Sequence, residues 1–202
     1  MRLSRSVAAQ RAMGVLLGVA WSWFAWNHFD AYRATGIVVF LLFFIGESIQ
    51  AILFVIRRVP RETATDVRDW LIAGIGAFVV LCFTPGGAVV WEDGKYFIVA
   101  GFLLQMFSLI SLNRSFSIVA ANRGIQRSGA YRIIRHPMYA SYILSIVGYL
   151  LFNASPQNIF IFGVFLVFTY LRIEAEERLL LRDKNYEAYC HVVRFRLIPY
   201  VY

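Results

Sequence analysis

The chain has 202 residues, of which 59% are hydrophobic and 17% aromatic, and its formal net charge is +8. Soluble domains are usually about 45–50% apolar, so this composition disfavours a water-soluble protein and predicts one that resides in a membrane. The positive net charge is explained by basic loops that stay on the cytoplasmic side and by attraction to anionic lipid. We therefore expect no nucleic-acid partner.

Six apolar segments come close to the length that a helix needs to cross a hydrocarbon core. The first could pass for a signal peptide, but it lacks a small-residue cleavage site and five more segments follow. The fifth reaches only about 22 Å as a helix, so five full spans are an alternative to six. The sequence therefore predicts an all-α fold, a polytopic transmembrane helical bundle built from segments 12–29, 36–56, 70–84, 96–112, 138–152 and 158–173.

The basic residues between these segments predict their orientation, because cytoplasmic loops are enriched in lysine and arginine. If both termini are cytoplasmic, 18 of the 20 basic residues lie on that side and only Arg33 and Lys95 do not. We therefore expect residues 57–69, 113–137 and 174–202 to face the cytoplasm. The membrane would be a cell inner membrane or the endoplasmic reticulum, depending on the organism.

The N-terminal part, residues 1–95, carries apolar runs whose tryptophans suit anchoring at the membrane interface. Glu47 is an exception, because a carboxylate inside an apolar run is costly unless it has a partner or faces a cavity. A hydrogen bond between helices, with help from Ser48 or Gln50, is the main interpretation, and contact with a substrate is the alternative. The scattered cysteines and histidines predict neither a disulfide nor a metal site.

The most informative stretch is SGAYRIIRHPMY, which ends a loop with five arginines and no acidic residue. Pro137 suits the first position of a helix, so the fifth helix is expected to begin at His136 or Pro137. The free N–H groups of that helix start, beside Arg135, would form a site for a carboxylate or a phosphate. An anchor whose arginines hold lipid phosphates is the alternative.

Three carboxylates follow the sixth segment in helical register, in the stretch RIEAEERLL. Glu174 has Arg178 four residues later, which is an ordinary helix pair. Glu176 has Arg172 four residues earlier, which is a second such pair. Spacing leaves Glu177 as an unpaired carboxylate beside apolar residues and therefore favours it as a ligand. A solvated glutamate is the alternative.

Together these patterns resemble the isoprenylcysteine carboxyl methyltransferase and phospholipid methyltransferase family. The resemblance covers about residues 95–199, with the ordered stretches AGFLLQMFSLISLNRSFSIV, SGAYRIIRHPMYASY, EERLL and YEAYCHVVRFRLIP. It implies a membrane methyltransferase that uses S-adenosylmethionine on a lipophilic acceptor, namely the carboxylate of a prenylated cysteine, a lipid amine or another lipid group. Residues 96–202 would be the catalytic half, with a helical hairpin at 138–173 and a cytoplasmic helical tail at 174–202, and residues 1–95 would select the substrate.

The resemblance also implies which residues form the site. The cofactor would contact Tyr131, His136, Pro137, Tyr139, Glu176 and Glu177, and the catalytic residues would be Arg135 and Glu177. The cofactor carboxylate could meet the helix start with His136 or Arg135, and Glu177 could accept hydrogen bonds from its ammonium group or ribose hydroxyls. Arg135 could orient a carboxylate acceptor, whereas an amine acceptor would need a base such as a glutamate.

Departures from the family pattern leave the acceptor open. Ala130 stands where proline often follows the glycine, and Ala140 with Ser141 replaces a common Leu-Gly pair. Membrane sterol reductases share a related hairpin and a similar motif, but they usually carry asparagine before the tyrosine. Met138 occupies that position here, which disfavours a nicotinamide cofactor. A reductase of that type is the alternative enzyme, and a non-catalytic binding or transport protein is the alternative outside the enzymes. Membrane lipids are the expected partners, and the sequence does not indicate an oligomeric state.

Overall fold

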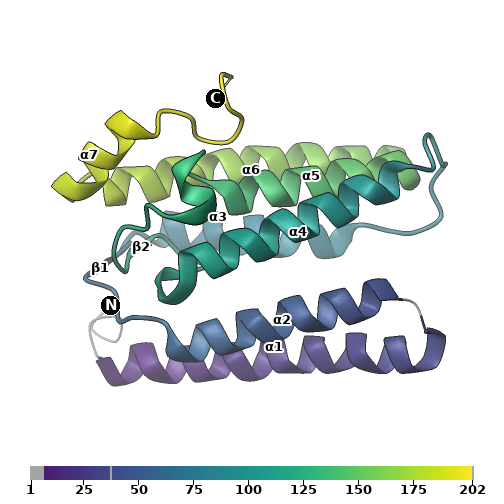
Figure 1. Cartoon of the computed structure of the whole chain (residues 1–202), viewed down its shortest axis with the longest axis horizontal. Helices are drawn as coiled ribbons and strands as arrows, with labels where there is room; N and C mark the ends of the chain where they lie inside the picture. The colour runs from purple at the N-terminus through teal and green to yellow at the C-terminus, as the bar shows by residue number, and fades with distance from the viewer. Residues whose placement is uncertain (1–6, 37, 202) are drawn as a thin grey trace.

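Helices dominate the computed structural model, which describes residues 7–36 and 38–201 (Figure 1). Its α-helices are α1 (Val7–Thr35), α2 (Val38–Ile56), α3 (Val67–Phe78), α4 (Gly94–Leu112), α5 (Pro137–Phe152), α6 (Pro156–Leu180) and α7 (Lys184–Val192). The predicted helical fold is confirmed, with one correction to the all-α description. A short antiparallel pair joins β1 (Glu62–Thr63) to β2 (Ala121–Asn122).

Each of the six predicted apolar segments contains a helix, but the helices differ in length. Gly94–Ser115 and Pro156–Leu180 are long and apolar enough to cross a membrane, whereas Phe40–Ile56 and Pro137–Phe152 are apolar but shorter. The third segment is shorter than predicted, because α3 ends at Phe78 and only a 3-10 turn continues it. The number of helices that fully cross the membrane, six or five, therefore remains a prediction.

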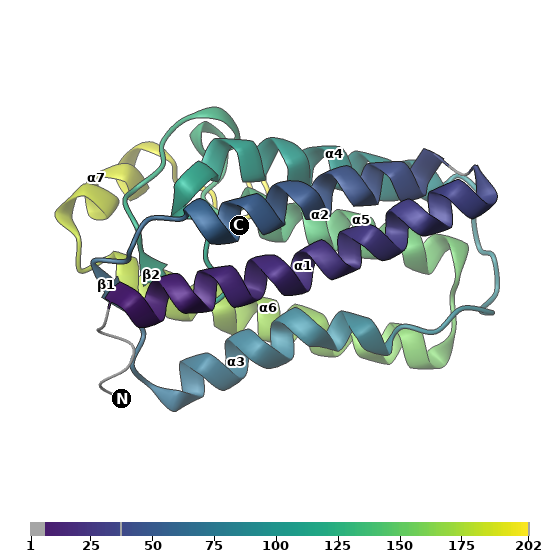
Figure 2. The same cartoon turned by 90° about the horizontal axis from the view of Figure 1, so that it is seen from below.

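The helices run roughly along one direction, with the α1–α2 hairpin on one side of the other helices (Figure 1). Seen from below, α3 lies on the opposite side of the molecule from α4 (Figure 2). The hairpin needs a glycine at its contact, since a Cβ at Gly14 would lie 2.6 Å from the carbonyl oxygen of Phe54. Likewise, a Cβ at Gly148 of α5 would lie 2.6 Å from the oxygen of Gly94 in α4. These close backbone approaches bring α1 against α2 and α4 against α5.

The carboxylate of Glu47 pairs with a histidine of the neighbouring helix. Its Oε2 lies 2.8 Å from Nδ1 of His28, so the pair joins α1 to α2. The expected bond between helices is confirmed, although the partner is neither Ser48 nor Gln50. Sequence spacing could not identify His28, because the two residues meet only when the hairpin closes.

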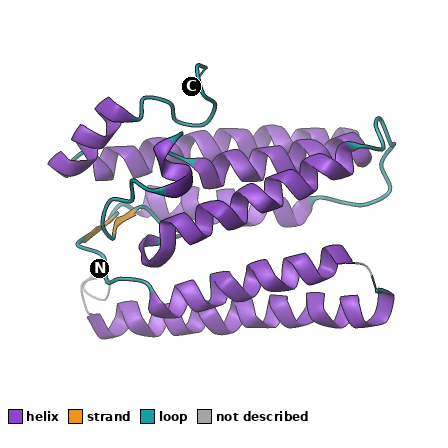
Figure 3. Cartoon of the chain, viewed as in Figure 1, coloured by secondary structure: helices purple, strands orange, loops and turns teal. Residues whose placement is uncertain are grey.

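The loops predicted to be cytoplasmic gather at one end of the molecule. The strands β1 and β2 and helix α7 all lie at the end from which α1 starts (Figures 1 and 3). Their pairing places Glu62 opposite Asn122 and Thr63 opposite Ala121. Arg2 and Arg5, which supported a cytoplasmic N-terminus, lie outside the described residues. Their position at one end agrees with the prediction that these loops lie on the same side of the membrane. That this side is the cytoplasmic one remains a prediction.

Cysteine labelling in sealed vesicles can test that side. In a background of Cys82→Ser and Cys190→Ser, cysteines placed at Ser128 and Lys184 should react with an impermeant maleimide only from the cytoplasmic side. A cysteine at Glu92, in the loop before α4, should react only from the opposite side. All three positions are exposed. Labelling of Ser128 and Glu92 from the same side would contradict the predicted topology.

The predicted division at residues 95 and 96 separates helices that pack together. Helix α3, from the first part, packs on α6, where a Cβ at Gly76 would lie 2.7 Å from Cδ of Arg172. Across the same contact, Asp69 of α3 pairs with Arg178 at 2.8 Å. Helix α3 therefore supports the helix that carries the three carboxylates, and the division into two functional parts remains a prediction.

Candidate active site

The start of α5 is held by the C-terminal segment of the chain. Helix α5 begins at Pro137, with His136 at its N-cap and no side-chain cap, which confirms the predicted start. Proline suits this position because its fixed φ matches the helix and its missing N–H would have no partner there. The backbone N–H groups of Arg135 and His136 donate to the carbonyl oxygens of Phe195 and Arg196, both at 2.9 Å. Residues 195 and 196 thus lie beside the helix start.

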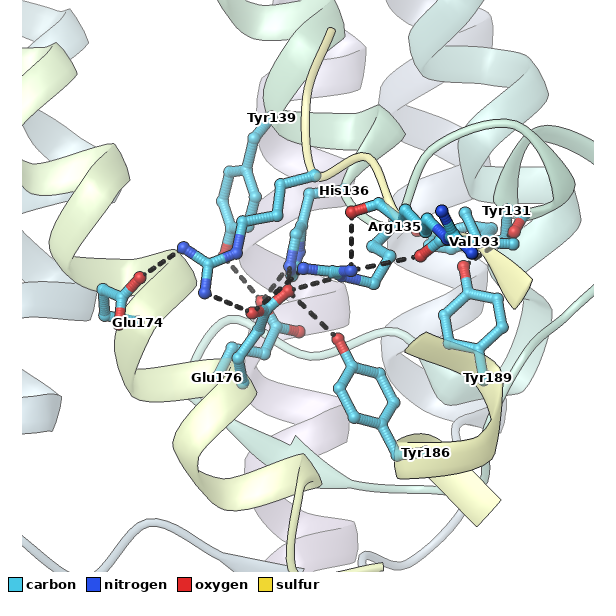
Figure 4. A network of polar contacts seen from close by, with 12 residues as sticks. Tyr131, Arg135, His136, Tyr139, Glu174, Glu176, Tyr186, Tyr189 and Val193 are labelled. Carbon is cyan, nitrogen blue, oxygen red and sulfur yellow. Dashed lines mark hydrogen bonds and ion pairs between the residues drawn. The ribbon is translucent and has the colours of Figure 1, made fainter. Parts of the chain in front are cut away.

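Glu177 lies at the centre of a buried network of charges. Figure 4 shows side chains of this network, among them Arg135, His136 and Tyr186. Nε of Arg135 donates to its Oε1 at 2.7 Å, and Nε2 of His136 lies 2.9 Å from the same oxygen. Nη2 of Arg196 lies 2.8 Å from Oε2, and the hydroxyl of Tyr186 lies 3.5 Å from Oε1. Only 3% of Glu177 is exposed. The prediction of an unpaired Glu177 is therefore wrong.

The helix pairs predicted from spacing are also wrong. Glu174 pairs with Arg196 at 2.5 Å, and Arg178 pairs with Asp69 of α3 at 2.8 Å. Spacing along α6 reveals only partners on the same helix, whereas these partners come from the C-terminal segment and from α3. Arg196 lies in the predicted cytoplasmic tail at 174–202, and nothing in the local sequence connects it with the carboxylates of α6.

Glu176 is the more accessible carboxylate of the pair. Its Oε2 accepts a hydrogen bond from the hydroxyl of Tyr139 at 3.0 Å, and Nδ1 of His136 lies 4.0 Å away. The predicted partner Arg172 lies over the ring of Tyr139 instead, 5.1 Å from its centroid. The Glu176 side chain is 32% exposed, and within the described residues no hydrogen bond reaches its Oε1. One carboxylate oxygen is thus available to a ligand.

A cavity of about 480 Å³ lies beside Glu176. Of the predicted site residues, it is lined by Tyr131, Arg135, His136, Tyr139 and Glu176, but not by Pro137 or Glu177. Its apolar wall includes Trp21, Phe43, Phe102 and Phe165. The cavity therefore joins a polar end, at the start of α5, to an apolar region formed with α1, α2 and α4.

Tyrosines form much of the polar end. Tyr186 and Tyr189 of α7 line the cavity together with Tyr131, and the hydroxyl of Tyr189 donates to the carbonyl oxygen of Tyr131 at 2.7 Å. Burial raises the pKa of Tyr131, Tyr186 and Tyr189, and the charge of Glu177 adds to the effect at Tyr186. The hydroxyls therefore stay protonated. Their three-residue spacing places Tyr186 and Tyr189 on one face of α7, which was the available sequence signal for them.

Comparison with known families identifies the group to which the chain belongs. A family model described as phospholipid methyltransferase matches residues 87–188, slightly more than half of the chain. The chain belongs to the phospholipid methyltransferase family. This family lies within the isoprenylcysteine and phospholipid methyltransferase group, so the resemblance inferred from the sequence is confirmed. No curated protein matches the chain.

The matched region contains most of the site. It includes the start of α5, the carboxylates of α6 and the first five residues of α7, whereas Tyr189, Arg196 and the α1–α2 hairpin lie outside it. The family identifies the chain as a methyltransferase, and its two long apolar helices support residence in a membrane. The cofactor, the acceptor and the residue roles belong to the proposal below.

Proposed function

We propose that this family member is a multi-pass membrane enzyme that transfers a methyl group from S-adenosylmethionine to a lipophilic acceptor. The observation that carries the proposal is the available carboxylate oxygen of Glu176 at the polar end of a cavity whose other wall is apolar. In this proposal both termini and the polar end of the cavity face the cytoplasm, as the basic loops predict.

The polar end suits the chemical groups of S-adenosylmethionine. Oε1 of Glu176 could accept hydrogen bonds from the ammonium group or the ribose hydroxyls. The first N–H groups of α5, which no side chain caps, could receive the carboxylate with help from His136. The tyrosine rings offer aromatic faces to a cationic sulfur and to an adenine. Each part of the cofactor therefore has a matching group in the cavity wall.

Arg135 and Glu177 have different roles in this proposal from those expected at first. The guanidinium of Arg135 binds Glu177 and donates to the carbonyl oxygens of Val193 and Arg194 at 3.1 and 2.8 Å. Those contacts leave it less free to orient an acceptor. Glu177 is enclosed by cations, so we assign it a positioning role, in which it fixes Arg135 and His136 beside the cavity. Glu176 takes the ligand contact that spacing had favoured for Glu177.

Catalysis by this chain would consist mainly of alignment. Bound S-adenosylmethionine would supply a methyl group already activated by a positively charged sulfur. The apolar wall would hold the acceptor chain and exclude water, so that the nucleophile meets the methyl group in line. A carboxylate acceptor would need no base. An amine acceptor would have to lose a proton, and Glu176, held by Tyr139, lies at the cavity wall where it could accept that proton.

Calorimetry and methyl transfer test the proposal together. Purified full-length protein in detergent should bind S-adenosylmethionine and its demethylated product, with no comparable affinity for a reduced nicotinamide cofactor. Incubation with methyl-labelled S-adenosylmethionine and a lipid extract should place the label in an extractable lipid. Failure to bind either sulfur compound would contradict the cofactor assignment, and a label found only in a water-soluble product would contradict the lipophilic acceptor.

A further inference from the structure

Two arginines outside the carboxylate network are buried and have no acidic partner among the described residues. Arg57 follows the last residue of α2, and Arg123 follows β2; they are 9% and 6% exposed. The Nε atom of each is buried and has no hydrogen-bond partner in the part of the chain that the structure describes. The Arg57 guanidinium lies 5.6 Å from the ring centroid of Phe54, and Nη1 of Arg123 donates to the carbonyl oxygen of Arg58. Both guanidinium groups therefore keep unused donors.

No acidic side chain of the described residues balances the charges of Arg57 and Arg123. None of the ion pairs among the described residues includes Arg57, Arg58 or Arg123. Burial lowers the pKa of Arg57, and burial together with the charge of Arg57 lowers the pKa of Arg123 to about 10. Burying like charges without a counterion is unfavourable. Such an arrangement is expected where an anion from outside the chain belongs.

The surroundings of the pair indicate what kind of anion would fit. A small crevice there is lined by four arginines and no acidic residue, namely Arg11, Arg57, Arg58 and Arg123, with Gln10 and apolar side chains completing it. Exposed apolar side chains of α2 lead up to it, including Ile52 at 57% and Val55 at 48% exposure. An arginine cluster at the end of an exposed apolar helix suits a ligand with a phosphate at one end and hydrocarbon at the other.

We propose that Arg57 and Arg123 form a binding site for the phosphate group of an anionic membrane lipid, whose acyl chains lie along α2. Guanidinium groups bind phosphate oxygens through paired hydrogen bonds, and the negative phosphate would balance the buried charges of both arginines. Arg123 also lines the large cavity, so the lipid headgroup would lie at its edge and link the α1–α2 hairpin to the loop that contains β2. The site uses none of the groups assigned to the methyl donor.

Lipid binding by charge-neutralised variants tests this site without any methyl donor. The full-length protein in neutral detergent is titrated with a short-chain phosphatidylglycerol at constant ionic strength, and its affinity is compared with those of Arg57→Gln and Arg123→Gln. We expect a loss of about tenfold or more in both variants, because each removes charge-assisted hydrogen bonds. The matched control is Arg68→Gln, an exposed arginine in the first turn of α3, which should change the affinity by less than about twofold.

Stability measurements keep the test informative if a variant binds poorly for other reasons. Without anionic lipid, Arg57→Gln should melt at the same or a higher temperature than the wild type, because the substitution removes an unbalanced buried charge. Arg123→Lys keeps the charge but loses the paired donors, so it should fold and still bind more weakly than the wild type. A markedly lower melting temperature for Arg57→Gln in lipid-free detergent would overturn the proposal.

Inorganic phosphate distinguishes the two possible sources of the anion. Weak binding of inorganic phosphate beside tight, arginine-dependent binding of phosphatidylglycerol would support the lipid. Equally tight, arginine-dependent binding of inorganic phosphate would support the phosphate site and assign it to a free anion. Equal losses of lipid affinity in Arg57→Gln, Arg123→Gln and Arg68→Gln would overturn the proposal, because general surface charge would then explain the binding. Because no methyl donor is present, these outcomes are independent of the proposed methyltransferase activity.

Discussion

Replacing Glu177 with glutamine is expected to lower the free energy of unfolding by about 3–5 kcal/mol, the usual cost of breaking a buried ion pair on one side. The amide would leave the charges of Arg135 and Arg196 without their shared carboxylate. Water cannot replace it well, because only 5% of the Glu177 side chain and 9% of the Arg135 side chain are exposed. Denaturation of the purified protein in detergent measures the change. Limited proteolysis should also show faster cleavage of residues 181–201, because the network holds this segment against α5 and α6.

Glu174→Gln is the matched control for this prediction. Glu174 lies on the same helix and shares the partner Arg196, but its side chain is 40% exposed. The expected loss is therefore below about 1 kcal/mol. A double replacement, Arg135→Met with Glu177→Leu, should recover part of the stability lost in Glu177→Gln, since no buried charge of that pair remains. Equal destabilisation by Glu174→Gln and Glu177→Gln would contradict the central position assigned to Glu177.

Replacing Glu176 with glutamine is expected to weaken S-adenosylmethionine binding by about ten- to a hundredfold, which corresponds to about 1.5–3 kcal/mol for a charge-assisted hydrogen bond. The effect follows from the available Oε1 of Glu176 at the cavity wall. The stability of this variant should change little, because the carboxylate is partly exposed and, within the described residues, accepts a hydrogen bond only from Tyr139. Calorimetry with the folded variant measures the affinity.

Two comparisons identify the cause of such a loss. Glu174→Gln, which removes a carboxylate away from the cavity lining, should bind the cofactor with nearly wild-type affinity. Tyr139→Phe should cause a smaller loss than Glu176→Gln, because the ring and the carboxylate both remain while only the orienting hydroxyl is lost. Unchanged affinity in folded Glu176→Gln would show that the ligand contact has been assigned to the wrong glutamate.

Local sequence patterns were sufficient for the helices and for the family. Apolar runs of helical length predicted six segments, each of which contains a helix in the structure, and Pro137 predicted the start of α5. The ordered motifs identified the family group, because the residue types and their order can be read from the sequence without knowing how the helices pack. The predicted third segment stops directly before Pro85, but the α-helix already ends at Phe78, so this proline does not account for the early end of α3.

Tertiary structure alone decided which charged groups meet. Helix spacing predicted Glu177 as the free carboxylate, but packing encloses it with Arg135, His136 and Arg196 and leaves an oxygen of Glu176 open to the cavity. The same limit applies to Arg57 and Arg123, which are far apart in the sequence and buried together in the fold. Residue types and spacing determine local structure through backbone geometry and hydrophobicity. The partner of a long charged side chain depends on how the helices pack and on which distant segments of the chain lie beside them. No local sequence pattern predicts this.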